Sequence, residues 1–252
     1  MMMLSTVRMS RPEVGWRAGY DATVPKTADD AGADVSGTVG RYLEAIFYID
    51  GEGEVVRASR LAEWLGVSQP TTGAAIQRMV RDGLLKMGPA RELQLTKKGR
   101  HVAAGIVRRH RIAERWLADV LKFDWLQADI EASRLEHGMS MEVADRLHTL
   151  IGKPATCPHG NPIPGVVAER RPERMLAGLG PGESARLVRV SEVAEHDAPE
   201  LLRFLTEHRF TLNGRVEMIE ASRGAGTVTV AVGGRRVSMS NEVARRIWVA
   251  AG

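Results

Sequence analysis

The segment that most constrains the fold is residues 55–87, VVRASRLAEWLGVSQPTTGAAIQRMVRDGLLKM. Apolar residues at three- and four-residue spacing give residues 58–65 an inward stripe, and Gly66 ends that helix. Ser68 is a favoured N-cap for the next helix, and Pro70 is tolerated in its first turn. Two short extended runs around a GPAR turn follow. The order predicts a winged helix-turn-helix, with a small helical domain carrying an incidental hairpin as the alternative.

The remaining chain divides into helical and extended halves. A helix is predicted from Val39, a long one begins at KKGR, and two more cover DWLQADIEASRLEHGMS and MEVADRLHTLIG. The stretch KPATCPHGNPIPG is dense in Pro and Gly and predicts an ordered loop or linker. Beyond it, SARLVRV, GRVEMIEA, TVTVAVGG and RRVSMS alternate apolar and polar residues, with the helix APELLRFLTEHR after the first. This pattern favours a small antiparallel barrel.

Composition narrows the class of protein. The chain has no apolar run of the roughly 18 residues that a membrane span needs, so no membrane partner is expected. Its single cysteine, Cys157, excludes an internal disulfide framework and fits a reducing cytoplasm. Net charge is only +4, but basic residues cluster, as in KKGR and RRHR. Such clusters indicate a polyanion partner or a solvated helix face.

Acidic residues and histidines recur at helical spacing in the middle of the chain. On one helix, offsets of four, seven and eight place four polar residues on a single face. Four residues apart on the preceding helix stand another histidine and glutamate. Together the two helices offer two imidazoles and three carboxylates, which suit manganese, ferrous iron or zinc, although a solvated face has the same pattern. The four residues on one face are Asp129, Ser133, Glu136 and His137, and the pair on the preceding helix is His110 and Glu114.

The order of these motifs resembles one known family. A winged helix-turn-helix, then RHRIAERWL, RLEHGMS and GNPIPG, then a small barrel, is similar to the diphtheria toxin repressor family of iron- and manganese-dependent transcriptional regulators. The resemblance covers about Thr38 to the end. It implies that a winged-helix domain binds double-stranded operator DNA, that a helical domain forms the homodimer and the metal sites, and that the third domain is SH3-like.

The implied fold is mainly α with a small β domain: winged helix-turn-helix, helical dimerisation domain and C-terminal SH3-like (FeoA-type) barrel. We therefore expect a disordered N-terminal extension at 1–37, a DNA-binding domain at 38–100, a dimerisation and metal-binding domain at 101–156, a Pro/Gly linker at 157–173 and a barrel at 174–252.

The resemblance also implies a metal site that is intact in ligand type. His110 and Glu114 match the family's pair on the long helix, and Asp129 stands where iron regulators have a histidine. Glu192 and Glu195 stand where those regulators draw two ligands from the third domain. We expect these five residues to form the working site.

A further site that the resemblance implies departs from the family pattern. Glu136 and His137 match paired ligands, and Glu44 matches an acidic ligand of the manganese branch. Ser133 replaces a cysteine, however, and Arg41 replaces a methionine or aspartate, and arginine cannot ligate a metal. An Arg41 guanidinium paired with Glu136 would supply a permanent positive charge in place of the ion.

DNA contacts are carried over in the same way. Ser68, Pro70 and Thr71 match positions that face the major groove, whereas Ala74 replaces a glutamine able to reach a base edge. Arginines on the helix-turn-helix and wing are expected to contact phosphates, namely Arg57, Arg60, Arg78, Arg81 and Arg91.

The sequence thus predicts a homodimeric repressor of metal-homeostasis genes, activated for operator binding by Mn(II) or Fe(II), and not an enzyme. One rival is a DNA-binding dimer that no longer needs metal because Arg41 acts as a built-in cation. A metal-dependent hydrolase is the other, and it lacks an evident nucleophile or general base. Cys157 and His159 fall short of the four ligands of a structural zinc site, so a structural loop is expected there.

Overall fold

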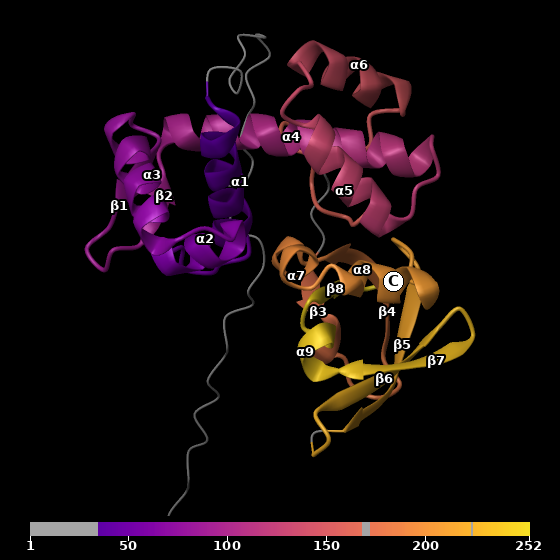
Figure 1. Ribbon diagram of the computed structural model, residues 1–252. Coiled ribbons are helices and arrows are strands. Elements are labelled where there is room, and N and C mark those ends of the chain that lie inside the picture. Colours follow the sequence, from indigo (N-terminus) through magenta and orange to yellow (C-terminus); the bar gives the residue numbers. More distant parts are fainter. Residues whose placement is uncertain (1–34, 168–171, 223) are drawn as a thin grey trace, which may run out of the picture.

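The computed structural model describes residues 35–167, 172–222 and 224–252 (Figure 1). Residues 1–34 of the predicted N-terminal extension therefore lie outside the described part of the chain. The first helix begins at Gly37, capped by the side chain of Ser36, which is one residue earlier than the predicted domain start.

The N-terminal half has the predicted winged helix-turn-helix order. Gly66, with φ at +63°, adopts the left-handed conformation that ends the first helix of the motif. The Ser68 side chain accepts a hydrogen bond from the amide of Thr71, and this caps the second helix. The elements are α1 (Gly37–Gly51), α2 (Ala58–Leu65), α3 (Gln69–Arg81), β1 (Leu85–Met87) and β2 (Leu93–Leu95).

A single long helix joins this half to the helical middle of the molecule. Helix α4 (Lys97–Asp119) packs its first turns against α1 and its later turns against α5 (Trp125–Leu135) and α6 (Met141–Leu150) (Figure 1). The expected boundary between residues 100 and 101 therefore falls inside one helix. Within the described residues, none of the helices has the length and apolarity needed to cross a membrane.

The C-terminal part is an antiparallel sheet with the strand order β3-β8-β4-β5-β6-β7 among the described residues. The four predicted strands and the predicted helix are present, whereas β3, β8, α7 and α9 were not predicted because each is short. Alternate residues of the longer strands point into a core that includes Leu187, Met218 and Val230. The elements are β3 (Glu173–Met175), β4 (Ser184–Val190), α7 (Glu192–Asp197), α8 (Glu200–Glu207), β5 (Arg215–Ser222), β6 (Thr227–Val232), β7 (Arg235–Ser240), α9 (Asn241–Ala244) and β8 (Ile247–Ala250).

The predicted linker begins as a packed loop. Cys157 and Asn161 are joined by a backbone hydrogen bond of 2.9 Å, and both are buried. The carbonyl of His159 accepts a 2.9 Å hydrogen bond from the amide of Val190 at the end of β4. Gly160, with φ at +91°, lies so close to β4 that an added Cβ would be 1.9 Å from the carbonyl oxygen of Val188. The loop is thus fixed against the barrel. Residues 168–171 of the predicted linker lie outside the described residues.

Helix α7 packs the barrel against the winged helix-turn-helix half. The rings of Trp64 and His196 stack with centroids 3.7 Å apart, and His196 Nε2 lies 3.0 Å from the Trp64 carbonyl oxygen. Arg60 donates to Asp197 at 2.7 Å. At the end of α1, the Glu52 carboxylate accepts a 2.8 Å hydrogen bond from the amide of Glu192. These contacts place α7 between the two domains.

The start of α4 requires a residue without a side chain at position 99. A Cβ on Gly99 would lie 2.0 Å from the backbone oxygen of Leu84, which cannot move without displacing β1. We expect Gly99→Ala to lower the free energy of unfolding by about 1–3 kcal/mol, the usual effect of overpacking. Urea unfolding followed by circular dichroism measures the change.

The matched control is Gly73→Ala in α3, because an added Cβ there meets nothing within 4 Å. Replacing an unconstrained helical glycine should raise stability by about 0.5–1 kcal/mol. Equal effects of the two substitutions would contradict the close approach at Gly99.

Candidate metal centre

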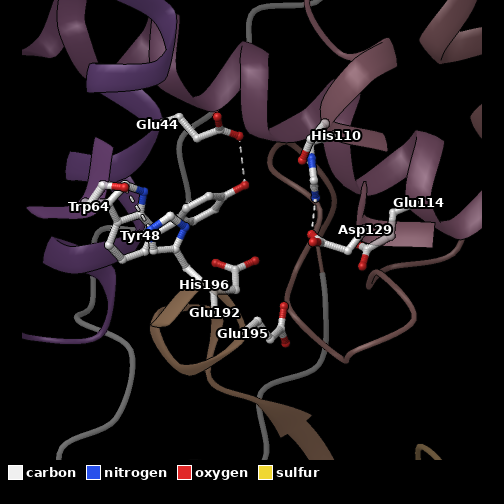
Figure 2. A pocket seen from close by; sticks show the side chains of 10 residues that line it. Glu44, Tyr48, Trp64, His110, Glu114, Asp129, Glu192, Glu195 and His196 are labelled. Atoms are coloured by element: carbon white, nitrogen blue, oxygen red, sulfur yellow. Dashed lines mark hydrogen bonds and ion pairs between the residues drawn. The ribbon is translucent and has the colours of Figure 1, made fainter. Parts of the chain in front are cut away.

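Polar side chains from four elements line a pocket where the domains meet (Figure 2). Helix α1 provides Glu44 and Tyr48, α4 provides His110 and Glu114, and α5 provides Asp129. Helix α7 closes the pocket from the barrel side with Glu192, Glu195 and His196. The pocket therefore gathers residues from all three predicted domains.

His110, which lines this pocket, lies between two carboxylates. Its Nδ1 lies 2.8 Å from Oε2 of Glu136, and its Nε2 lies 3.4 Å from Oδ1 of Asp129. Burial opposes a charge on the imidazole, but the hydrogen bonds to the two carboxylates outweigh it and raise the pKa of His110 well above its usual value. The ring is thus held between two negatively charged oxygens.

Glu136 connects the end of α5 to both histidines. Helix α5 ends at Leu135, about one turn earlier than the predicted helix. Glu136 is therefore its C-cap, and His137 lies in the turn that follows. The Glu136 carboxylate is buried, with Oε1 2.9 Å from Nδ1 of His137. Burial raises its pKa, but the hydrogen bonds from His110 and His137 prevail and lower it to about 2. The carboxylate is therefore ionised.

Helix α1 approaches this cluster closely. An added Cβ at Gly40 would lie 3.1 Å from Nε2 of His137. One turn further on, Glu44 accepts a 2.9 Å hydrogen bond from the hydroxyl of Tyr48 (Figure 2). Burial and then the charge of Glu136 raise the pKa of Glu44 well above its usual value. The surroundings of this carboxyl group therefore oppose its ionisation.

The donor set fits a divalent ion. Ligand atoms of Glu44, His110 and Glu136 lie within 4.8 Å of one another, and those of His110, Glu114 and Asp129 form a second such group. Oxygen and imidazole donors suit a hard or borderline ion such as Mn(II) or Fe(II). The raised pKa values of His110 and Glu44 indicate that protons compensate an excess of carboxylates there, a role that a cation could take over.

Glu192 has a different partner from the predicted metal. Arg111 donates to its carboxylate at 2.6, 2.7 and 2.9 Å, and only 1% of the Arg111 side chain is exposed. Burial would lower the pKa of Arg111, but the charge of Glu192 raises it above its usual value. The positive charge of the Arg111 guanidinium already compensates the negative charge of the Glu192 carboxylate. We therefore do not count Glu192 among the candidate metal ligands.

Arg41 does not pair with Glu136. Its side chain is exposed and makes no ion pair with any described residue. Both oxygens of Glu136 face histidines instead. The hypothesis of a built-in cation at Arg41 therefore lacks its contact. Ser133 is exposed at the rim of the pocket.

The basic run RRHR is internal rather than a surface for a polyanion. Arg108 donates to Asp145 at 2.7 Å and to the carbonyl of Pro164, and Arg109 donates to the carbonyl of Glu136 at 2.8 Å. Arg111 belongs to the Glu192 pair. Sequence periodicity could not distinguish these roles, because the partners lie on other elements.

Among the predicted DNA contacts, Arg60 is the one that the structure places elsewhere. Its guanidinium pairs with Asp197 and lies 5.1 Å from the centroid of the Trp64 ring, on the face towards the barrel. Arg78 lies 3.8 Å from Asp82. The other predicted contacts are exposed on the helix-turn-helix and wing, namely Arg57, Ser68, Pro70, Thr71, Arg81 and Arg91.

Sequence reasoning missed several residues at this centre. Tyr48 and Trp64 occupy ordinary apolar positions of amphipathic helices, and nothing in the linear pattern marks them. His159 lies in the predicted structural loop, but the sequence did not indicate that its ring would be completely buried beside Glu114. Its neighbours come from α4 and α7, far away in the sequence.

Three family models match the chain in succession. Residues 34–93 match the iron dependent repressor N-terminal DNA binding domain, residues 96–165 match its metal binding and dimerisation domain, and residues 174–251 match the FeoA domain. The three matches together cover most of the chain from residue 34 to residue 251.

Individual relatives agree with the family models. The iron-dependent repressor IdeR of Mycobacterium tuberculosis is 40% identical over 195 residues, which cover 76% of this chain and 80% of the relative. The diphtheria toxin repressor of Corynebacterium efficiens is 33% identical over 225 residues, covering 86% of this chain and 96% of the relative. A solved manganese-dependent transcriptional repressor in complex with manganese has a TM-score of 0.76 at 30% identity, covering 85% of this chain and 100% of the other.

The buried pair between Arg111 and Glu192 gives a test of the Glu192 assignment. Removing the carboxylate charge leaves a buried guanidinium without its counter-charge, so Glu192→Gln should cost about 3 kcal/mol of unfolding free energy in chelator. Because we assign Glu192 to Arg111, the metal content per subunit should stay that of the native chain. Urea unfolding and elemental analysis measure the two quantities.

Glu207→Gln, at an exposed carboxylate of α8, is the matched control and should change stability by less than about 0.5 kcal/mol. If Glu192→Gln lost one ion per subunit instead, Glu192 would be a ligand after all.

Proposed function

The chain belongs to the family of iron-dependent repressors, and on this premise we propose that Mn(II) or Fe(II) activates it, as a homodimer, to bind double-stranded operator DNA. The family consists of transcriptional repressors, not enzymes. The FeoA domain match and the antiparallel sheet identify the C-terminal part of the chain as an SH3-like domain. The regulated genes would be those of metal homeostasis.

The observation that carries the proposal is the cluster of Glu44, His110 and Glu136. It joins α1 of the DNA-binding half to α4 and α5 of the helical half. An ion held there would bind best to one arrangement of these elements, and only such a difference in affinity lets a metal shift a conformational equilibrium. The free energy of metal binding would then stabilise that arrangement of the two domains.

Two further groups of residues belong to this proposal. Glu114 and Asp129 share His110 and would hold a second ion beside the first. His137 contacts Glu136 and lies close to Gly40, so metal binding at the cluster would change the packing of His137 against α1. The donor types favour Mn(II) or Fe(II), which accept carboxylate oxygen and imidazole nitrogen.

The DNA interface that we propose is the exposed side of α3 and the wing. Ser68, Pro70 and Thr71 at the start of α3 would face the major groove, where the recognition helix of such motifs reads base edges. Arg57, Arg78, Arg81 and Arg91 would contact phosphates.

The homodimer interface that we propose lies on the helical domain. Apolar side chains there are 40–71% exposed, which is unusual for a chain that is folded alone. Val143, Leu147 and Leu150 line a groove along α6. The other exposed apolar residues of this domain are Val120, Leu121, Ile130 and Leu135.

The central prediction is that operator binding requires the metal and His110. His110→Ala removes the donor common to both ligand groups, so the difference in DNA affinity between metal-loaded and chelated protein should shrink by at least tenfold. Fluorescence anisotropy with a labelled operator duplex, with Mn(II), with Fe(II) under nitrogen and with chelator, measures this.

His208→Ala, in the barrel and bonded to the Phe204 carbonyl of its own helix, is the control and should retain the native metal response. Tight operator binding by the native chain in chelator, unaltered by His110→Ala, would contradict metal activation and favour the metal-independent alternative.

The proposed phosphate contacts predict a change in salt dependence. Each lost phosphate contact reduces the slope of log affinity against log salt by about 1, so Arg57→Ala should show this reduction for cognate and random duplexes alike. Arg60→Ala should leave the slope unchanged, because Arg60 faces Asp197 of the barrel. Anisotropy titrations between low and moderate salt compare the two, and equal slopes for both variants would contradict the assignment.

A further inference from the structure

One side of helix α3 faces away from the rest of the winged helix-turn-helix. The buried residues of α3 are Thr72, Ile76 and Met79, and the helix packs against α2 and β1. With about 3.6 residues per turn, the residues on the opposite side of the helix recur at every third or fourth position. We call these exposed residues the outward face, and they are Pro70, Thr71, Ala74, Gln77, Arg78 and Arg81.

The side chains of the outward face differ in what they offer to a partner. Ala74 offers a methyl group and no hydrogen bond. The hydroxyl of Thr71 lies 2.8 Å from that of Ser68 and shares a hydrogen bond with it, and Ser68 Oγ also accepts one from the amide of Thr71. The two arginines carry fixed positive charges. Gln77 is the residue of this face whose side chain is neutral and has both an acceptor and two N–H donors.

Gln77 lies well within the outward face. It is about 60° from Ala74 and about 40° from Arg81 around the helix axis, and about 100–160° from each of the three buried residues. Its side chain is exposed, and its amide has no hydrogen-bond partner among the residues that the structure describes. The amide is therefore available to a partner outside the chain.

The shape of α3 and the chemistry of this amide both suit the edge of a base. A helix is about 10–12 Å across with its side chains, and the major groove of DNA is about 12 Å wide, so the outward face of a helix in the groove meets the base edges. A glutamine amide matches adenine, because its oxygen accepts from N6 while its N–H donates to N7. Arginines on the same face are drawn to phosphates by charge.

We propose that Gln77 reads one adenine in each half-site of the DNA, and that this residue sets the base preference there. The inference rests on the proposed function, since it names the residue that gives the DNA interface part of its sequence specificity. Because the amide is neutral, it contributes to the choice of sequence and not to the salt-dependent attraction of the phosphates.

The test offers the full-length chain, loaded with Mn(II), a pool of DNA duplexes that contain a stretch of random base pairs. Sequencing of the bound duplexes gives the base preference at each position. We expect the native chain to prefer adenine at one position of each half-site by about tenfold or more, as a bidentate contact provides. Gln77→Ala should lose this preference and keep the others. It should also fold, because alanine is the strongest helix former. Equal preferences at every position for the two proteins would overturn the proposal.

A second variant has a readout that a purely structural role of Gln77 would not change. A carboxylate can only accept hydrogen bonds, and it accepts from N4 of cytosine. Gln77→Glu should therefore change the preferred base at this position from adenine to cytosine. An unchanged preference for adenine in Gln77→Glu would contradict base reading by this residue.

Gln69→Ala is the matched control, because Gln69 is also an exposed glutamine of α3 but lies within about 20–80° of each buried residue around the axis. It should retain the preference for adenine. Gln77→Ala should also keep the native slope of log affinity against log salt, since no phosphate contact is lost. A preference that disappears in Gln69→Ala and persists in Gln77→Ala would assign the reading to the wrong glutamine and overturn the proposal.

The outcome is separable from that of the proposed function. If the native chain selects no common sequence from the pool, with or without metal, operator binding itself fails. If it selects the same sequence in chelator and Gln77→Ala loses the adenine, metal activation fails and this inference stands. If the native chain needs metal to select its sequence and Gln77→Ala selects it equally well, this inference alone fails.

Discussion

The structure depends on how an excess of buried carboxylates is compensated where its domains meet. Glu44, Glu114, Glu136, Glu192 and Glu195 approach this point from α1, α4, the end of α5 and α7. An isolated buried carboxylate is too costly to persist as an ion, so each must find a cation or a proton. Arg111 serves Glu192, the imidazolium of His110 serves Glu136, and burial raises the pKa of Glu195 to about 8.

This compensation connects the domains to one another. Groups that supply charge and groups that need it lie on different domains, so any ion held between them favours the arrangement that brings them together. The stacked pair Trp64 and His196 and the ion pair Arg60 to Asp197 also join the barrel to the DNA-binding half. These contacts need no metal. The chain thus has a permanent attachment at α7 beside a proposed conditional one at His110.

How far the sequence could lead differed between the fold and the site. Local rules located the capped helix after Ser68, the left-handed turn at Gly66 and the four longer strands, because caps, turns and periodicity act within a few residues. The same rules misplaced Arg60 and left the role of Arg111 open. Both lie in basic runs that suggest phosphate binding, but their partners, Asp197 and Glu192, are more than eighty residues away.

The sequence by itself determined the longer elements, the family and the donor types at the candidate metal centre, since residue identity and spacing suffice for these. Only the tertiary structure decided which donors meet. It gave Glu192 to a guanidinium, left Arg41 in solvent and brought His159 between Glu114 and Glu195. The physical reason is that compensation of a buried charge depends on distance and on access to water, and neither is set until the helices and the barrel have packed.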